Sequence, residues 1–329
     1  MTIKVPALFF LGLSGIRLPL TGHPGLAIGG QLRITNDRAG IERLIGAYTD
    51  HMGTVEHHHL VHFASALVYA RDTTDLPATG RAEAMNRVVV DRLREIQAWL
   101  MKLWLVKDNA VDPDIGWLVL DIDGDTAVNN NRWSTLFSRA DGSTAVTEFT
   151  RDELARATAA PLDPDDFGAG EPVAIGVPGA SDPRVTQLSY GSLRFQRFLY
   201  FVNAARGTKD VAIKIALYCS GLEAIVSTSH AELTHQVSER AAILLRRRGE
   251  ERLAIFRDMK SAYGMRSKAV HGAAFRDRDH EALIAGSIRL DAICREVALA
   301  YFAQDDFRQA LGGNDENFGA FWTQKLFLD

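Results

Sequence analysis

Apolar positions follow mixed periods in the N-terminal part of the chain and helical periods in the C-terminal part. In the N-terminal part, residues 82–106 are predicted to form a long helix, and residues 37–48 a shorter one with Asn36 or Asp37 as its N-cap. The long helix is indicated by apolar side chains at helical spacing: Val89, Leu93, Ile96, Leu100 and Leu103. Strands are predicted over 5–11, 116–122 and 126–138, with a hairpin turn at Asp123-Gly124-Asp125 between the last two.

The C-terminal part is predicted to be entirely helical, with helices near 192–206, 209–227, 231–247, 251–271 and 279–304. The change of pattern falls near 185–192, after a segment rich in Pro and Gly (178–183) that is typical of a loop or linker. With 329 residues and 47% hydrophobic content, the chain is long enough for two domains. We therefore predict an α+β fold: a mixed α/β domain over 1–187, sensory or regulatory in role, and an all-α domain over 188–329.

The predicted helix over 251–271 carries a cation and an imidazole five residues apart, Arg266 and His271. Arg266 falls on the apolar stripe of this helix, which we assign to Phe256, Met259, Tyr263 and Val270. Burying an unpaired guanidinium costs several kcal/mol: removing one partner of a buried ion pair, for example, costs about 3–5 kcal/mol. Arg266 therefore needs a partner or a function. His271 precedes Gly272, a predicted helix stop, so the helix end favours a cation there and is expected to raise the pKa of His271.

The two side chains are not stacked on one face of that helix, since five residues turn about 140° beyond a full revolution. They converge only through the length of the Arg side chain, a distorted last turn, or a second copy of the chain. Ser267 lies four residues before His271 on the same face, where its hydroxyl could orient the imidazole.

Glu223 is the only charged residue between Lys214 and Glu232, in an otherwise apolar predicted helix. A carboxylate in that setting needs a cation, and Arg240 or Arg266 is the expected partner. The pair is interpreted first as a core ion pair that holds helices together. The alternative is that it positions Arg266 for catalysis.

Three motifs in order resemble the Apea-like group of the HEPN family over the C-terminal two fifths of the chain, from about Leu193. They are Ala216-Leu217-Tyr218-Cys219-Ser220-Gly221-Leu222-Glu223, Val237-Ser238-Glu239-Arg240-Ala241-Ala242-Ile243-Leu244-Leu245 and Tyr263-Gly264-Met265-Arg266-Ser267-Lys268-Ala269-Val270-His271-Gly272. The resemblance implies a HEPN-type helical bundle that forms a homodimer or a higher homo-oligomer. Two Arg-x(4 to 6)-His elements would then face each other across a two-fold cleft.

What the resemblance implies about activity is metal-independent endoribonuclease cleavage, in antiviral defence or a toxin system, with an antitoxin or another defence-system protein as partner. Arg266 and His271 would be catalytic, with Ser267, Glu223 and Tyr263 in support. Many active relatives have Asn, Asp or His directly after the Arg, whereas this chain has Ser267. The alternative is therefore a catalytically inactive HEPN module that binds RNA, a nucleotide or a protein as a sensor or scaffold.

The chemistry of RNA fits these residue types. The 2′-hydroxyl attacks the adjacent phosphate when a base removes its proton and an acid protonates the leaving 5′-oxygen, and two His residues from paired subunits can supply both functions. Arg266 would stabilise the charge that develops on the phosphoryl oxygens. This reaction needs no metal or other cofactor, leaves a 2′,3′-cyclic phosphate and excludes DNA as a substrate.

Charge is unevenly distributed around the net value of −4. Residues 240–280 hold eleven Lys or Arg against five Asp or Glu, whereas residues 108–182 hold four against fifteen. We predict that the basic segment contacts the RNA backbone. The residues assigned to this contact are Arg246, Arg247, Arg248, Lys268 and Arg276. A solvated helix face is the alternative interpretation of the triple Arg.

The remaining candidate sites are weaker. Five of the ten His residues fall within residues 51–62: His51, His57, His58, His59 and His62. We interpret them as a polar, partly exposed segment in preference to a zinc site, because no HExxH pattern accompanies them. Residues 121–125 resemble a calcium loop only superficially and are interpreted as a turn. Cys219 and Cys294 lack metal or redox spacing, which fits small buried side chains in a reducing cytoplasm. No membrane span is predicted, because no run of 18 apolar residues occurs.

Overall fold

The computed structural model describes residues 2–22, 24–132, 136–167, 193–229, 231–246, 248–271 and 275–328. Contacts within the chain divide it into two compact units. Of the described residues, the first unit holds 2–132 and 145–164, and the second holds 136–144, 165–167 and 193–328. The class is α+β, as predicted: an antiparallel sheet in the first unit and helices in the second.

The first unit is built on a six-stranded sheet in the order β3-β4-β5-β1-β6-β7. The strands are β1 (Thr2–Ser14), β3 (Leu26–Gly29), β4 (Leu32–Thr35), β5 (Ala66–Pro77), β6 (Asp112–Ile122) and β7 (Asp125–Asn131). β1 lies at the centre and pairs antiparallel with both β5 and β6, for example Phe10 with Tyr69 and with Trp117. β2 (Ile16–Arg17) and β8 (Thr147–Glu148) form a separate parallel pair.

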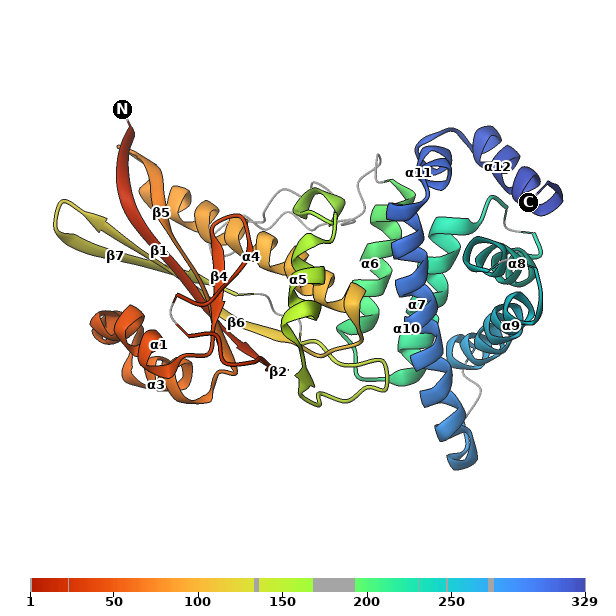
Figure 1. Cartoon of the computed structure of the whole chain (residues 1–329), viewed down its shortest axis with the longest axis horizontal. Helices are drawn as coiled ribbons and strands as arrows, with labels where there is room; N and C mark the ends of the chain where they lie inside the picture. The colour runs from red at the N-terminus through yellow and green to blue at the C-terminus, as the bar shows by residue number, and fades with distance from the viewer. Residues whose placement is uncertain are drawn as a thin grey trace. The chain divides into compact units, whose positions relative to one another are not determined.

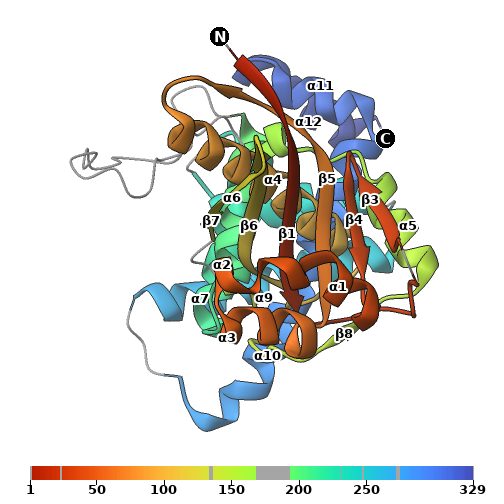
Figure 2. The same cartoon turned by 90° about the vertical axis from the view of Figure 1, so that its left-hand side faces the viewer.

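Helices cover both faces of this sheet, as Figure 2 shows. One face carries the short helices α1 (Arg38–Ile45), α2 (Thr49–Met52) and α3 (Thr54–His58), with η1 (Gly46–Tyr48) and η2 (His59–Phe63). Ile41, Ile45 and Leu60 bury their side chains there against the sheet. The other face carries α4 (Arg81–Val106), which packs closely enough that a methyl group added at Gly116 would lie 3.1 Å from Leu93. Apolar side chains that alternate along β1 therefore pack into two hydrophobic cores, one on each face of the sheet.

The second unit is a bundle whose helices are drawn from green to blue in Figure 1. Its helices are α6 (Arg194–Arg206), α7 (Val211–Val226), α8 (Leu233–Leu245), α9 (Glu250–Val270), α10 (His280–Ala303), α11 (Asp305–Gly312) and α12 (Asp315–Phe327), with η4 (Asp277–Asp279) before α10. α7 contacts α6, α8, α9 and α10. It is therefore the central helix of the bundle.

Most sequence-based elements of the helical part are confirmed within a few residues, but the boundary proposed at 187/188 lies outside the described residues. α5 (Arg151–Ala159), η3 (Pro164–Phe167), α11 and α12 were not predicted. The strand predicted over 126–138 is too long, because β7 ends at Asn131. Residues 136–144 belong to the helical unit instead. None of the helices in the described part of the chain combines the length and hydrophobicity needed to cross a membrane.

Candidate functional site

An ion pair between α7 and α9 forms the centre of the candidate site. Nη1 of Arg266 lies 2.5 Å from Oε1 of Glu223, and Nη2 lies 3.4 Å from Oε2. The side chains of Arg266 and Glu223 are 28% and 18% exposed, so the pair is half-buried. Of the two cations considered from the sequence, Arg266 is the partner of Glu223.

Tyr263 completes this arrangement one turn before Arg266. Its hydroxyl donates to Oε1 of Glu223 at 3.0 Å, and the Arg266 guanidinium lies 5.6 Å from the centre of its ring. Burial raises the pKa of the Tyr263 phenol, and the Glu223 carboxylate raises it further. The phenol therefore stays protonated and acts as a hydrogen-bond donor that fixes the carboxylate.

The apolar stripe that places Arg266 differs in part from the predicted one. The buried residues of α9 are Ile255, Met259, Ala262 and Tyr263, which recur at helical spacing and lead to Arg266. Phe256 is only half-buried, and Val270 is 61% exposed, so its assignment to the stripe was wrong. The buried stripe does not continue beyond Arg266, because Ser267, Lys268 and Val270 are exposed.

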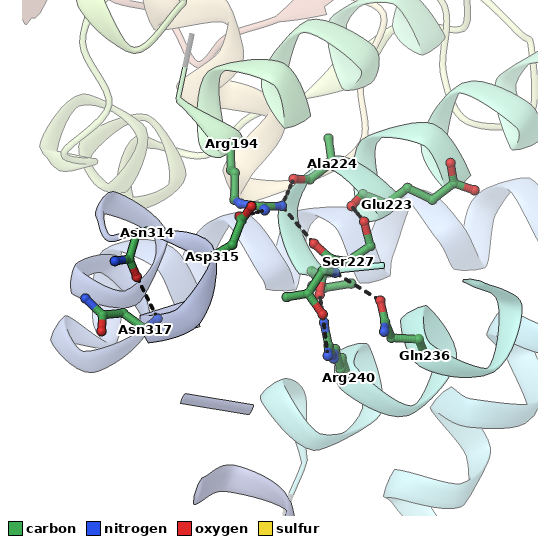
Figure 3. A network of polar contacts seen from close by, with 11 residues as sticks. Arg194, Glu223, Ala224, Ser227, Gln236, Arg240, Asn314, Asp315 and Asn317 are labelled. Carbon is green, nitrogen blue, oxygen red and sulfur yellow. Dashed lines mark hydrogen bonds and ion pairs between the residues drawn. The ribbon is translucent and has the colours of Figure 1, made fainter. Parts of the chain in front are cut away.

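Two arginines close the C-terminal end of α7 just after Glu223 (Figure 3). Arg194 donates to the carbonyl oxygens of Ala224 at 3.4 Å and Ser227 at 2.8 Å, and Arg240 donates to Val226 at 2.7 Å. Burial lowers the pKa of Arg240 to about 10, against the favourable charge of Glu239. Cations at a helix C-terminus satisfy carbonyl groups that lack helical partners. The cap therefore fixes the end of the helix that carries Glu223.

Aromatic rings of α12 support both capping arginines. The Arg194 guanidinium lies 4.7 Å from the centre of the Phe318 ring, and that of Arg240 lies 5.2 Å from the Trp322 ring. Arg194 also bonds Asp315 at the start of α12. Sequence reasoning gave Arg194 no role and missed α12. An apolar run that contains Phe318, Phe321 and Trp322 near the C-terminus was the available signal.

His271 is exposed and stands at the C-cap of α9, as the sequence predicted for the last turn. Its backbone N–H donates to the carbonyl of Ser267 at 3.0 Å. No hydrogen bond or ion pair joins its imidazole to any residue in the described part of the chain. Among the described residues of one copy, the side chains of Arg266 and His271 therefore make no direct contact, which leaves a second copy among the routes named above for their convergence, and Gly272 lies outside the described residues. Ser267 is also exposed.

The basic segment divides into engaged and exposed cations. Arg246 forms ion pairs with Glu296 at 2.6 Å and Glu251 at 3.5 Å, so its charge is already matched. Arg248, Lys268 and Arg276 are exposed, and Arg247 lies outside the described residues. Arg246 therefore has a structural task, whereas the side chains of Arg248, Lys268 and Arg276 are accessible from solvent.

The His-rich segment contains contacts between His side chains and carboxylates, and contacts between aromatic rings. Nε2 of His59 lies 3.1 Å from Asp114, that of His57 lies 3.6 Å from Glu42, and the rings of His58 and His62 are 4.5 Å apart. Across the residues that the structure describes, no three His, Cys, Asp or Glu side chains are grouped to hold a metal ion. Both cysteines are buried, as predicted, and burial raises the pKa of the Cys219 thiol to about 12.

Comparisons of the chain with models of protein families, with curated proteins and with solved structures found no match. The function is therefore inferred from the arrangement of side chains on α7 and α9 and from the three motifs in the sequence.

Proposed function

We propose that this protein is a metal-independent endoribonuclease of HEPN type that works in antiviral defence or a toxin system. The proposal depends above all on one observation: Arg266 is held by Glu223 and Tyr263 at the surface of a helical bundle, five residues before an exposed His271. The resemblance of the three sequence motifs supports the assignment to the HEPN family, and the exposure of the cations Arg248, Lys268 and Arg276 supports RNA binding.

Arg266 acts on the phosphate. Its Nη atoms bond Glu223, which fixes the plane of the guanidinium, and the Arg266 side chain as a whole keeps 28% of its surface exposed, so that a phosphate can approach it. A donor that is already fixed needs little reorganisation when negative charge develops in the transition state. Glu223 and Tyr263 are positioning residues in this account, because they bond Arg266 or each other and do not touch the substrate.

His271 moves the protons. One imidazole removes the proton from the 2′-hydroxyl, the 2′-oxygen bonds to phosphorus, and the bond from phosphorus to the 5′-oxygen breaks. A second imidazole, protonated beforehand, gives its proton to the leaving 5′-oxygen. The products are a 2′,3′-cyclic phosphate and a 5′-hydroxyl, and each His contributes roughly 10² to 10⁴-fold.

The second imidazole comes from a second copy of the chain. Within one ideal helix the Cα atoms of Arg266 and His271 lie roughly 9 Å apart and their side chains diverge. An isologous contact at the end of α9 would bring two such elements together. We expect a homodimer in light scattering at micromolar concentration. A monomer under these conditions would contradict the two-fold site.

The test is cleavage of single-stranded RNA in EDTA by the full chain. His271→Ala is expected to reduce the rate at least 10²-fold with unchanged thermal stability, because the side chain is exposed. The matched control is His280→Ala, which removes another exposed His at the start of α10 and should leave the rate unchanged. Equal activity in both variants would exclude His271 as a catalytic residue.

A second candidate function, an inactive module that binds RNA, a nucleotide or a protein partner, is favoured by one observation. Both Nη atoms of Arg266 are engaged by Glu223, which is what a purely structural ion pair requires. Arg266→Ala separates the two functions. A structural ion pair predicts lost stability and unchanged RNA binding, whereas the catalytic role predicts loss of cleavage at temperatures where the variant remains folded.

A further inference from the structure

The segment Leu136–Thr144 belongs to the helical unit and is buried there in part, although it lies between β7 and β8 in the sequence. Phe137, Ser138 and Ala140 are 6%, 1% and 1% exposed. Gly142 adopts a φ of +81°, and a methyl group there would lie 2.5 Å from the carbonyl oxygen of Lys209. The backbone of this segment therefore follows the connection between α6 and α7 too closely for any side chain at Gly142.

Polar groups of this segment meet the end of α6 and the start of α7. Ser138 Oγ donates to the carbonyls of Arg206 and Thr208, at 3.2 and 2.6 Å. Lys214, which is fully buried, donates from Nζ to the carbonyl oxygens of Ala205 at 2.8 Å and Ser138 at 3.4 Å. A buried ammonium group requires such acceptors, because desolvation of the charge is otherwise very costly. The segment thus supplies part of the environment that holds α7.

The same segment also holds α10. Ser287, fully buried on that helix, donates from Oγ to the carbonyl oxygen of Ala140 at 2.6 Å. Its neighbour Gly286 lies against α9, since a methyl group at Gly286 would come within 2.9 Å of Sδ of Met265 and 3.9 Å of Cδ1 of Ile215. The close approach of α10 to α9 at Gly286 is therefore next to Ser287, the residue of α10 that bonds the segment.

The contacts of the segment with Lys214 and with Ser287 both occur next to residues that lie close to Arg266 in the structure. Ile215 follows Lys214 on α7, Gly286 precedes Ser287 on α10, and the two meet around Met265, the residue before Arg266. α7 also carries Glu223. Movement of either helix would consequently change the distance between Glu223 and Arg266 or the packing under Met265.

We propose that the segment Leu136–Thr144 is a positioning element for the Glu223–Arg266 pair, which it acts on through Lys214 of α7 and Ser287 of α10. This inference deepens the proposed function and rests on it where catalytic activity is measured. Hydrogen exchange, in contrast, tests the positioning role without any RNA cleavage.

The test compares Ser287→Ala with Ser238→Ala in the full chain. Both serines are fully buried on helices, but among the described residues Ser238 Oγ bonds only the carbonyl of Thr234 in its own helix, at 2.6 Å. Native-state hydrogen exchange is followed in peptides that cover residues 259–271 and, as a reference, α12. Loss of a buried hydrogen bond is expected to speed exchange in the α9 peptides about tenfold in Ser287→Ala, and not in Ser238→Ala.

Ser138→Ala gives a second variant from the segment itself, should Ser287→Ala not fold, and the same rise in α9 exchange is expected. If the enzyme is active, kcat falls in both variants with KM unchanged. Equal exchange in Ser287→Ala and Ser238→Ala, or a rise spread evenly over α9 and α12, overturns the inference. If the wild-type chain does not cleave RNA but Ser287→Ala still speeds α9 exchange, the proposed function fails and the positioning role stands.

Discussion

The Glu223 carboxylate accepts from two side chains of α9, and this explains why an apolar helix contains one acidic residue. Arg266 neutralises its charge and Tyr263 satisfies a further lone pair. Half-buried charge pairs are stable only when their remaining hydrogen bonds are made. The three side chains therefore act as a unit, and the direction of the Arg266 guanidinium depends on the other two.

Tyr263→Phe tests this unit through its pH dependence. In the unfolded chain the phenol ionises near pH 10, whereas burial and Glu223 raise its pKa in the folded protein. Its contribution is therefore fully present below pH 10 and is lost as the pH rises above it. Chemical denaturation at pH 9 to 11.5 should show a shallower loss of stability in the variant, by roughly 1 kcal/mol per pH unit. Identical slopes would mean that Tyr263 ionises equally in both states.

At the residue scale, the sequence predicted that Glu223 pairs with an arginine but did not decide which one. Arg240 and Arg266 both lie on predicted helices, and only the packing of α7 against α9 decides between them. Val270 shows the opposite error. Its apolar side chain fitted the helical period, but it is 61% exposed in the structure, because periodicity along one helix does not show how far neighbouring helices cover it.

At the element scale, α7 owes its fixed end to cations from two other helices. Arg194 of α6 and Arg240 of α8 both bond its last carbonyls, and both stack on rings of α12. This arrangement links three helices to the turn that follows Glu223.

Replacement of the cap in Arg240→Met should lower the free energy of unfolding by about 1–3 kcal/mol, because hydrogen bonds from a charged donor to two oxygens are lost. The matched control is Arg257→Met, which replaces an exposed Arg of α9 and should change stability by less than about 0.5 kcal/mol. Urea denaturation of the full chain measures both. Equal stabilities would show that Arg194 alone caps α7.

Strand prediction failed where the local pattern was ambiguous. β5 was missed because its second half, Arg71–Asp75, has no buried side chain, so neither alternation nor an apolar run marks the whole strand. The hairpin between β6 and β7 was found because Asp123 and Gly124 have the positive φ angles that such turns require. Local sequence patterns could not predict that residues 136–144 belong to the helical unit. Their place there depends on hydrogen bonds with residues far away in the sequence, such as Thr208 and Ser287.

At the scale of the whole molecule, the proposed binding of RNA can be tested on the exposed cations of the basic segment. Because Arg246 is ion-paired, we expect Arg248, Lys268 and Arg276 to carry the backbone contacts. Replacing all three with Gln should reduce the slope of log K against log salt concentration by about 2, since each phosphate contact on a single strand contributes ~0.7. Fluorescence anisotropy with a short RNA measures the slope.

The control for charge alone replaces three exposed cations of the first unit, Lys4, Arg81 and Arg87, with Gln. The net charge changes equally in both triple variants, so general electrostatic attraction falls to the same extent. A slope that falls equally in both would mean that the basic segment makes no specific contact with the RNA backbone.

The central claim is tested most directly by the chemical nature of the RNA ends after cleavage. Mass spectrometry of a short RNA cut by the wild-type chain in EDTA should show a 2′,3′-cyclic phosphate and a 5′-hydroxyl. A single 2′-deoxy substitution should protect the adjacent bond, and His271→Ala should give no products. Fragments that end in a 3′-hydroxyl and a 5′-phosphate, or the same products from His271→Ala, would contradict the account.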